Sequence, residues 1–203
     1  LTIPDDFDAD LSPFPRTLGI AAAIPKLIVV SQRVQAVGLY ESGTLIRWAP
    51  TSTGKESTPT KNGLFSTNWK GKEVVSTFDD EWILKWNFNI VNFEGISLHQ
   101  YEMPGVPASH SCVRLFESDA KFIYDWADEW ILNADGSARV AYGTPVVIFG
   151  TYAFDQHPPW KDLPIDPLAT TVTADELHSA IGEYLEVINK RVVERAARTS
   201  ISE

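Results

Sequence analysis

The sequence contains a single cysteine, Cys112, and no run of eighteen consecutive apolar residues among its 203 positions. One cysteine excludes an intramolecular disulfide. A transmembrane helix needs about 20 apolar residues in succession, so we expect no membrane-spanning segment. Basic residues are also few and form no tract, since 17 Lys and Arg stand against 27 Asp and Glu, for a net charge of −10. Nucleic-acid binding requires a basic face, so this balance argues against a nucleic-acid partner.

The rest of the composition is that of an ordinary globular chain, with 44% hydrophobic and 22% charged residues. Residues 1–25 are acidic and contain four prolines, which predicts an extended lead-in to a domain. The first ten residues hold four Asp and no basic residue, unlike a signal peptide, and the chain starts with Leu rather than Met. We therefore expect that an upstream segment was removed by processing or cloning.

Residues 26–154 are predicted to form a domain made mostly of β-strands, because short apolar runs and period-two alternation dominate there. A hairpin is predicted over residues 33–49, with its turn at Glu41-Ser42-Gly43. Further strands are expected at residues 27–30, 64–68, 82–88, 95–98 and 144–149. Trp82 and Trp86 either line a cleft or pack as half-buried strand aromatics.

Two helices are expected. Ser118 is the predicted N-cap of a helix from Asp119 to Leu132. Thr173 opens a capping box before an apolar pattern that continues to about Arg195. Residues 155–203 therefore read as a Pro-rich linker followed by a C-terminal helix, and we expect the apolar stripe of that helix to pack on its own domain.

The candidate chemistry is concentrated around Cys112, in the segment Ser109-His110-Ser111-Cys112-Val113-Arg114, with His99 at the end of a predicted strand upstream. A nucleophilic cysteine needs its thiolate, which a nearby imidazole can generate. It also needs donors for the oxyanion, usually backbone N–H groups at a tight turn. The same residues allow a buried structural cysteine. A zinc site of His99, His110 and Cys112 would lack a fourth ligand.

Residues Pro107–Leu115 closely resemble the S-H-G-C-(I/V)-R motif of the L,D-transpeptidase (YkuD) catalytic domain family. Other stretches match the family in the same order: the opening hairpin at 26–48, S-T-G-K at 50–55, T-P-x-G-x-F at 58–65, the second histidine at 98–99 and G-T-P-V at 143–146. The resemblance implies a mainly β fold, a β-sandwich of the L,D-transpeptidase catalytic domain type, with a helix after the cysteine motif. We expect no cofactor and no metal.

By this resemblance the chain is an enzyme that acts on peptidoglycan stem peptides. It would form a thioester on Cys112, release the terminal D-alanine and pass the acyl group to an amine of another stem or of an envelope protein. Transfer to water would instead make it an L,D-carboxypeptidase or another hydrolase. The resemblance implies that carbapenem-type β-lactams inhibit the enzyme. Because its substrate lies outside the cytoplasmic membrane, it also implies a periplasmic or cell-envelope location.

The family's functional residues carry over onto matching positions. Cys112 corresponds to the nucleophile and His99 to the general base, and the backbone carbonyl of Gln100 would orient the imidazole. His110 would shape the site.

Three further motif residues, Ser109, Ser111 and Arg114, are assigned to substrate binding or to the oxyanion site. The backbone N–H groups of Ser111 and Cys112 would be the oxyanion donors. Arg114 would hold the motif loop or contact a substrate carboxylate.

The motif departs from the family at Ser111, where the family has glycine. Glycine is favoured where φ is positive or where a ligand approaches the backbone closely. A serine there leaves open a function of a different class, a peptidoglycan-binding module with an impaired active site. Retention of both His99 and Cys112 argues against that alternative. Only nine residues separate His99 from Ser109, so the flap over residues 101–107 is short.

Overall fold

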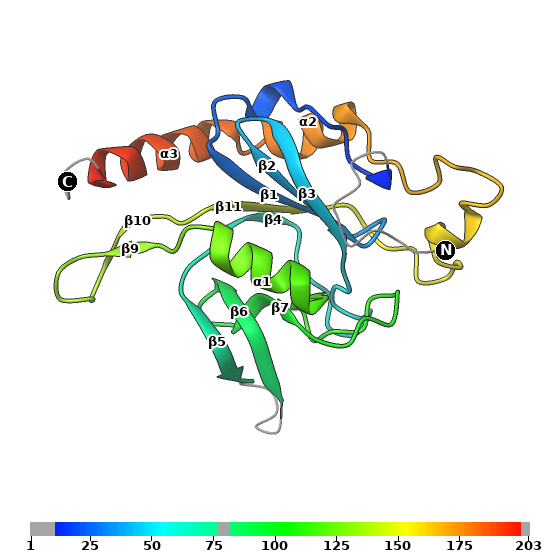
Figure 1. The fold of residues 1–203 in the computed structure, drawn as a ribbon, viewed down its shortest axis with the longest axis horizontal. Coiled ribbons are helices and arrows are strands. Elements are labelled where there is room, and N and C mark those ends of the chain that lie inside the picture. Colours follow the sequence, from blue (N-terminus) through cyan, green and yellow to red (C-terminus); the bar gives the residue numbers. More distant parts are fainter. Residues whose placement is uncertain (1–10, 77–81, 200–203) are drawn as a thin grey trace.

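A computed structural model describes residues 11–76 and 82–199 of the chain (Figure 1). The first ten residues of the predicted lead-in lie outside the described part. Strand order is β3-β2-β1-β11-β4 in a five-stranded sheet, β5-β6-β7-β8 in a four-stranded sheet and β10-β9 in a small two-stranded sheet. The predicted mainly β fold class is confirmed.

The strands are β1 (Lys26–Ser31), β2 (Ala36–Glu41), β3 (Thr44–Pro50), β4 (Gly63–Ser66), β5 (Lys70–Val75), β6 (Ile83–Val91), β7 (Ile96–Gln100), β8 (Val113–Leu115), β9 (Ile131–Leu132), β10 (Arg139–Ala141) and β11 (Pro145–Phe149). The helices are α1 (Glu117–Trp126), α2 (Ala174–Gly182) and α3 (Leu185–Thr199), with short 3-10 turns η2 (Gly19–Ala21) and η3 (Pro159–Asp162). None of the helices within the described ranges has the length and apolar character that crossing a membrane requires.

The five-stranded sheet is the middle layer of the molecule, with an apolar core on each face. In its central strand β1, Leu27 and Val29 belong to one core, whereas Ile28 and Val30 belong to the other. Successive side chains of a strand point to opposite faces, so a strand that is buried on both sides favours apolar residues at consecutive positions. This explains why β1 contains an uninterrupted apolar run.

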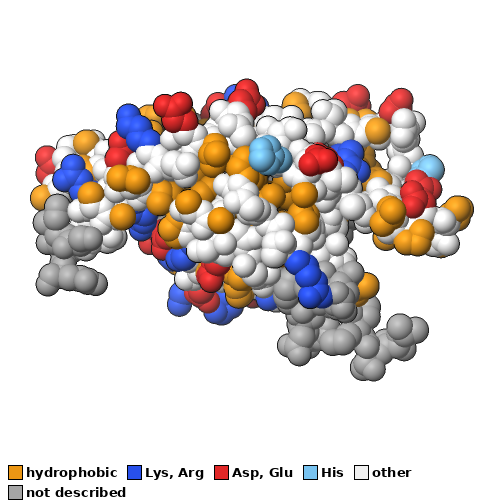
Figure 2. All heavy atoms as spheres, turned by 90° about the horizontal axis from the view of Figure 1, so that it is seen from above, with side chains coloured by type: hydrophobic (Ala, Val, Ile, Leu, Met, Phe, Trp, Pro, Cys, Tyr) orange, Lys and Arg blue, Asp and Glu red, His pale blue; other side chains and the backbone are white. Residues whose placement is uncertain are grey.

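The outer core lies between this sheet and the C-terminal helices, which run along its upper side in Figure 1. Leu177 and Ile181 of α2 and Ile188 of α3 are fully buried there. Thr173 caps α2 by accepting the backbone N–H of Glu176 at 3.1 Å. The predicted N-cap and the predicted packing on the domain are therefore confirmed. The Glu176 carboxylate, which in a capping box would accept from the backbone N–H of Thr173, instead accepts from Arg33 Nη2 at 2.9 Å. Figure 2 looks down on this side of the molecule, where acidic, basic and apolar side chains are mixed.

The C-terminal segment was predicted as one helix, and this is wrong, because the chain breaks between α2 and α3. The break follows Gly182, and glycine is a poor helix former. The N–H of Tyr184 donates to the carbonyl of Ile181 at 2.9 Å, which closes a turn instead of continuing the helix. The half-buried Tyr184 then packs against the outer core.

The inner core lies between the other face of the five-stranded sheet and the four-stranded sheet. Helix α1 lies in this layer (Figure 1). Phe88 of β6, Leu98 of β7, Val113 of β8 and Ile123 of α1 are all almost fully buried in it. These contacts fix the inner face of the four-stranded sheet and leave its outer face for other side chains.

Helix α1 begins earlier than predicted. Its first residue is Glu117 and its N-cap is Phe116, which makes no side-chain capping bond, so Ser118 is not the N-cap. Glu117 and Asp119 place negative charge in the first turn, where it interacts favourably with the helix dipole. Asp119 also pairs with Arg47 of β3 at 2.7 Å. This pair ties the first turn to the five-stranded sheet.

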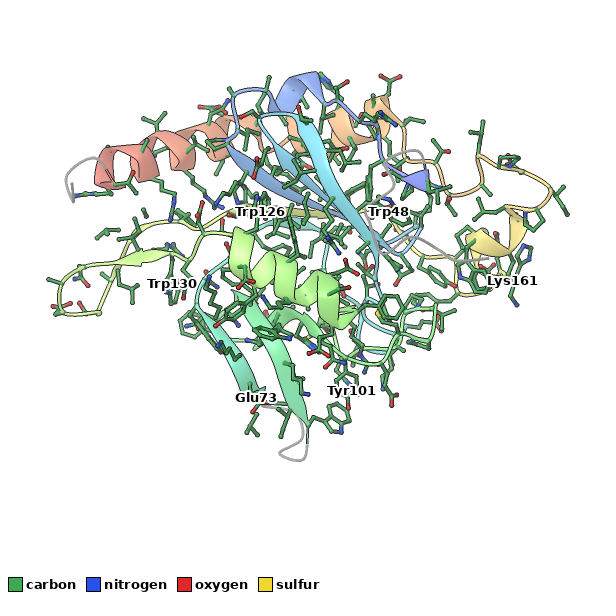
Figure 3. All side chains as sticks on the ribbon, viewed as in Figure 1. Trp48, Glu73, Tyr101, Trp126, Trp130 and Lys161 are labelled. Carbon is green, nitrogen blue, oxygen red and sulfur yellow. The ribbon has the colours of Figure 1, made fainter. Side chains whose placement is uncertain are left out.

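Helix α1 also ends earlier than predicted, at Trp126 rather than Leu132 (Figure 3). Lys26 Nζ donates to the carbonyl of Trp126 at 2.7 Å and to Asp128 Oδ1 at 2.9 Å. The N–H of Asp128 donates to Thr144 Oγ1 at 2.9 Å. These tertiary hydrogen bonds replace another helical turn, and Leu132 belongs to β9 instead.

Packing of α3 on the outer core makes a stability prediction. Ile188 is 0% exposed and Val193, on the same helix, is 69% exposed. Replacing Ile188 with Ala should lower the free energy of unfolding by about 2–4 kcal/mol, because a buried side chain is removed and a cavity remains. The matched variant Val193→Ala should change it by less than about 0.5 kcal/mol. Urea denaturation measures both, and equal effects of the two variants would contradict this packing.

Candidate active site

Parallel pairing of β7 with β8 places the candidate histidine and cysteine on one surface. Leu98 pairs with Val113, and His99 pairs with Arg114. Leu98 and Val113 are buried in the inner core, so the alternate positions His99, Arg114 and Cys112, which directly precedes β8, face the other side. These three side chains line one cavity. The register of β7 and β8 therefore directs Leu98 and Val113 into the inner core, and His99, Cys112 and Arg114 into the cavity.

The cavity extends over the outer face of the four-stranded sheet. From Cys112 it crosses β7 and reaches side chains of β6 and β5, among them Leu84, Asn87, Asn89 and Val74. Trp82, which precedes β6, also lines it, whereas Trp86 packs edge-on against Tyr124 of α1 with ring centroids 5.5 Å apart. Of the two tryptophans, only Trp82 thus belongs to the cleft.

His99 is buried, and its ring orientation is fixed by one hydrogen bond. Its Nδ1 lies 2.9 Å from the carbonyl oxygen of Gln100. A carbonyl only accepts, so in the neutral ring Nδ1 carries the proton and Nε2 carries the lone pair. Burial lowers the pKa of His99 to about 4, with Arg114 acting in the same direction and the bond to Gln100 opposing it. The imidazole is therefore neutral near pH 7 and able to accept a proton.

Cys112 is also held in its neutral form. Burial raises the pKa of its thiol, while the backbone N–H of Ser97 and the charge of Arg114 oppose the shift. The thiol donates to the carbonyl of Gly95 at 3.9 Å. A raised thiol pKa beside a lowered imidazole pKa means that the resting pair is thiol and imidazole, rather than thiolate and imidazolium.

The turn that carries Cys112 is anchored to the segment after β3. Ser52 and Arg114 exchange both backbone hydrogen bonds, at 3.0 and 3.1 Å. The N–H of Ser109 donates to the carbonyl of Thr53 at 3.0 Å, and Ser109 Oγ donates to the carbonyl of Cys112 at 2.6 Å. Position 54 requires glycine, because the Cβ of any other residue would lie only 2.3 Å from the carbonyl oxygen of Thr58. The two family-like stretches thus form one packed unit.

Ser111 adopts the conformation for which glycine is favoured, with φ of 75°. Two hydrogen bonds hold it there: Ser111 Oγ donates to the carbonyl of Thr58 at 3.3 Å, and Thr60 Oγ1 donates to the carbonyl of Ser111 at 3.0 Å. Neither the N–H of Ser111 nor that of Cys112 donates a hydrogen bond to another residue in the part of the chain that the structure describes. Serine thus keeps the left-handed turn, and both N–H groups remain available to a ligand.

His110 lies between an aromatic ring and a cation. Its ring packs against Trp82 with centroids 5.5 Å apart, and its Nε2 lies 3.0 Å from Lys55 Nζ. Burial lowers the pKa of His110, and the charges of Lys55 and Arg114 lower it further. Because the ammonium group only donates, Nε2 of His110 is the acceptor and the ring is neutral. This ring forms part of the cavity wall beside Cys112.

Arg114 is 9% exposed and lies over the ring of Tyr101, 4.6 Å from its centroid. Burial lowers the pKa of Arg114, and its electrostatic interactions with the side chains of Cys112 and Glu102 oppose this shift. Tyr101 also packs edge-on against His99 and near Trp82. Tyr101 directly follows β7 and is labelled in Figure 3. Arg114 thus fixes the ring beside the imidazole and brings positive charge to the cavity.

The short flap over residues 101–107 is held from two directions. Ser52 Oγ donates to the carbonyl of Val106 at 2.7 Å. From the Pro-rich segment, Trp160 Nε1 donates to the carbonyl of Gly105 at 3.0 Å. The chain beyond the β-rich body therefore contacts the flap and helps to hold it in place.

Five of the seven sequence-predicted site residues line the cavity: His99, Ser109, His110, Cys112 and Arg114. The other two act beside it, because the carbonyl of Gln100 contacts His99 and the side chain of Ser111 bonds the carbonyl of Thr58. Within the described ranges, no group of three His, Cys, Asp or Glu side chains is placed to hold a metal ion. Sequence reasoning assigned no role to Lys55 or Asn87. Lys55 lies in a family-like stretch, and Asn87 interrupts an apolar strand pattern, so both carried a usable signal.

The conformation of Ser111 makes a testable prediction. Replacing Ser111 with Gly removes left-handed strain but loses one long hydrogen bond, so the free energy of unfolding should rise by about 0.5 kcal/mol. Ser111→Ala keeps the strain and loses the bond, so it should lower that free energy by about 0.5–1 kcal/mol. Urea denaturation of both variants measures the difference. A Gly variant less stable than the Ala variant would contradict the observed turn.

Comparisons with known proteins identify the family and the fold. The family profile described as the L,D-transpeptidase catalytic domain, YkuD, matches residues 25–148. A solved L,D-transpeptidase from Stackebrandtia nassauensis is 24% identical, with a TM-score of 0.52 over 63% of this chain and 57% of that one. One from Mycobacterium smegmatis is 21% identical, with a TM-score of 0.50 over 62% of this chain and 59% of that one.

These likenesses show a shared fold, and the chain spans less than two thirds of the length of either solved protein. A comparison with curated protein sequences finds no match. The family profile covers more than half of the chain, including the whole segment that carries His99 and Cys112. The chain therefore belongs to the L,D-transpeptidase (YkuD) catalytic domain family.

Proposed function

We propose that this protein is a cysteine acyltransferase that acts on peptidoglycan stem tetrapeptides, an L,D-transpeptidase. The observation that carries the proposal is the pairing of β7 with β8. This pairing directs the side chains of His99 and Cys112 into the same cavity. Family membership supports an enzyme of this class. No cofactor is needed, because the thiol, the imidazole and the backbone supply the chemistry.

In the first half-reaction, Sγ of Cys112 attacks the carbonyl carbon of the bond between the diamino acid and the terminal D-alanine. The thiol proton passes to Nε2 of His99 as the S–C bond forms. Because both groups rest in their neutral forms, proton transfer and attack are coupled. The C–N bond then breaks, and the proton on His99 passes to the departing amine of D-alanine, which leaves a thioester.

In the second half-reaction, an acceptor amine gives a proton to His99 and attacks the thioester carbonyl. The C–S bond breaks, the proton returns to sulfur, and an amide product leaves. An amine of a second stem peptide gives a crosslink, an envelope-protein lysine gives an anchored protein, and water gives a trimmed stem. The same site performs all three, so the acceptor decides between transferase and hydrolase.

The tetrahedral intermediate carries an oxyanion that needs preorganised donors. The backbone N–H groups of Ser111 and Cys112 are suited to this role because the turn leaves both available. Arg114 adds positive charge nearby and either fixes Tyr101 or contacts a substrate carboxylate. The turn of Ser111 favours catalysis over the alternative of an impaired binding module, since serine adopts the conformation suited to glycine.

Two further properties follow from the same proposal. Peptidoglycan stem peptides occur in the cell envelope. An enzyme that acts on them must be there too, so we propose that the protein is periplasmic or at the cell surface. A carbapenem would acylate Cys112 by the same attack, with the S–C bond forming as the ring C–N bond breaks. The nitrogen atom released from the opened β-lactam ring then takes the proton from His99.

The direct test incubates the protein with a disaccharide tetrapeptide that carries meso-diaminopimelate, and follows protein and product masses. We expect an acyl adduct on the protein and free D-alanine, because the thioester precedes transfer. The control Cys112→Ala should give neither. Product masses then show crosslinked or trimmed stems.

Binding of the tetrapeptide by the folded protein without adduct or D-alanine would contradict the proposal and favour the binding module. A carbapenem provides an independent probe of the nucleophile, and we expect its mass to be added to the wild-type chain but not to Cys112→Ala.

A further inference from the structure

A β-bulge in β6 changes which side chains face the cavity. Lys85 pairs with Gln100 and Phe88 with Leu98, so β6 has one more residue than β7 between these pairs. Within the bulge, Trp86 has a φ of 52°, an unusual value for a bulky residue. Bulges next to active sites commonly redirect a side chain.

The bulge puts Asn87 on the cavity face. Leu84, before the bulge, and Asn89, after it, both line the cavity, whereas Phe88 lies in the inner core. Strict alternation from Leu84 would have turned Asn87 toward the core. The extra residue instead turns Trp86 against α1 and brings Asn87 into line with Asn89.

Asn87 and Asn89 differ sharply in their hydrogen bonds. Asn89 Oδ1 accepts from Asn68 at 2.9 Å, and its Nδ2 donates to the carbonyls of Val91 and Ile96 at 3.3 Å. Asn87 is 1% exposed, yet neither its Nδ2 nor its Oδ1 has a hydrogen-bond partner among the described residues. A buried amide without partners is costly and calls for an explanation.

We propose that Asn87 is a substrate-binding residue that pairs with a peptide group of the acyl donor, a role that rests on the proposed function. An asparagine amide offers one acceptor and two donors, which complements the N–H and C=O of a peptide unit. Because the amide is already removed from water, it loses little further solvation when a peptide pairs with it. The residue thus selects a peptide-bearing acyl donor over a smaller electrophile.

The position of Asn87 indicates which part of the donor it meets. Cys112 precedes β8 and Asn87 lies on β6, two strand spacings away, which is about 10 Å. The departing D-alanine is one residue and reaches at most about 3.6 Å. Only the retained acyl side is long enough, and at about 3.3 Å per residue the contact falls about three residues before the scissile bond.

Val74 is the side chain that the peptide must displace. Gly71 stands directly opposite Asn87 on β5, and a Cβ at Gly71 would lie 2.8 Å from Val74 Cγ2. Val74 therefore occupies the space beside Asn87 on the cavity face. Val74 is half-buried and on the outermost strand of its sheet, where a small side-chain movement meets little resistance.

The test compares Asn87→Leu with the matched variant Asn89→Leu. Leucine removes two unsatisfied polar atoms at position 87, so the Tm of Asn87→Leu should equal or exceed that of the wild type. At position 89 it breaks three hydrogen bonds, so the Tm should fall. The isosteric Asn87→Asp provides a second variant with little change of shape.

Acyl-enzyme formation is then followed by intact mass over a range of donor concentrations. The two donors are a disaccharide tetrapeptide and a dipeptide of diaminopimelate and D-alanine. For the tetrapeptide, Asn87→Leu should raise the half-saturating concentration about ten- to a hundredfold, as expected for two lost hydrogen bonds. Asn87→Asp keeps the acceptor oxygen and loses the amide donor, so it should raise that concentration about two- to tenfold. For the dipeptide, and for alkylation of Cys112 by iodoacetamide, both variants should match the wild type within twofold.

An unchanged tetrapeptide response, or an equal loss with both donors, would overturn the role of Asn87 while leaving the proposed function intact. A lower Tm for Asn87→Leu than for Asn89→Leu would also overturn it, since the amide would then be satisfied in the free protein. Absence of any acyl adduct on wild-type protein whose thiol still reacts with iodoacetamide would instead reject the proposed function, and this inference with it.

Discussion

Parallel pairing of β7 with β8 is the constraint on which the site depends, because it determines the side of the sheet that His99, Cys112 and Arg114 face. Leu98 and Val113 turn into the inner core, so His99 and Cys112 must turn outward. A shift of register by one residue would exchange these sets and bury the imidazole among apolar side chains. The apolar core therefore also determines the geometry of the candidate catalytic pair.

Burial then determines how this pair works. It lowers the pKa of His99 and raises that of Cys112, so both rest uncharged in the free protein. Such a thiol reacts slowly with solvent oxidants, since the thiolate is the reactive form. In the proposed mechanism, the imidazole acts as a base only when an electrophile is close enough for attack and proton transfer to proceed together. That mechanism thereby reserves the reactivity of the thiol for a bound acyl donor.

Local patterns predicted much of the fold. The turn at Ser42 and Gly43, both with positive φ, closes the predicted hairpin, and Thr173 caps a helix as its motif requires. The errors arose where tertiary contacts prevail. Lys26 Nζ donates a hydrogen bond to the carbonyl of Trp126, where α1 ends. The two residues are far apart in the sequence, so local sequence patterns could not predict this bond. Strand β5 was missed because its sequence is largely polar.

The features of the candidate site were likewise predictable only where they depend on local sequence. The motif around Cys112 is local in sequence, so its residues could be named in advance, and Ser111 could be recognised as a departure. Its φ of 75° and the two bonds that support it depend on the segment of Thr58 and Thr60. The pairing of Lys55 with His110 and the unpartnered amide of Asn87 likewise arise from contacts between distant segments.

The neutral His99 base is most directly tested by nitrogen-15 NMR of the imidazole in the free protein, with His99→Gln to assign its signals. With a folded pKa of about 4, the ring should stay neutral from pH 8 down to about pH 5 and protonate below that. Its proton should sit on Nδ1, where the carbonyl of Gln100 accepts it. Titration near pH 6.5 or above, or a proton on Nε2, would contradict this account.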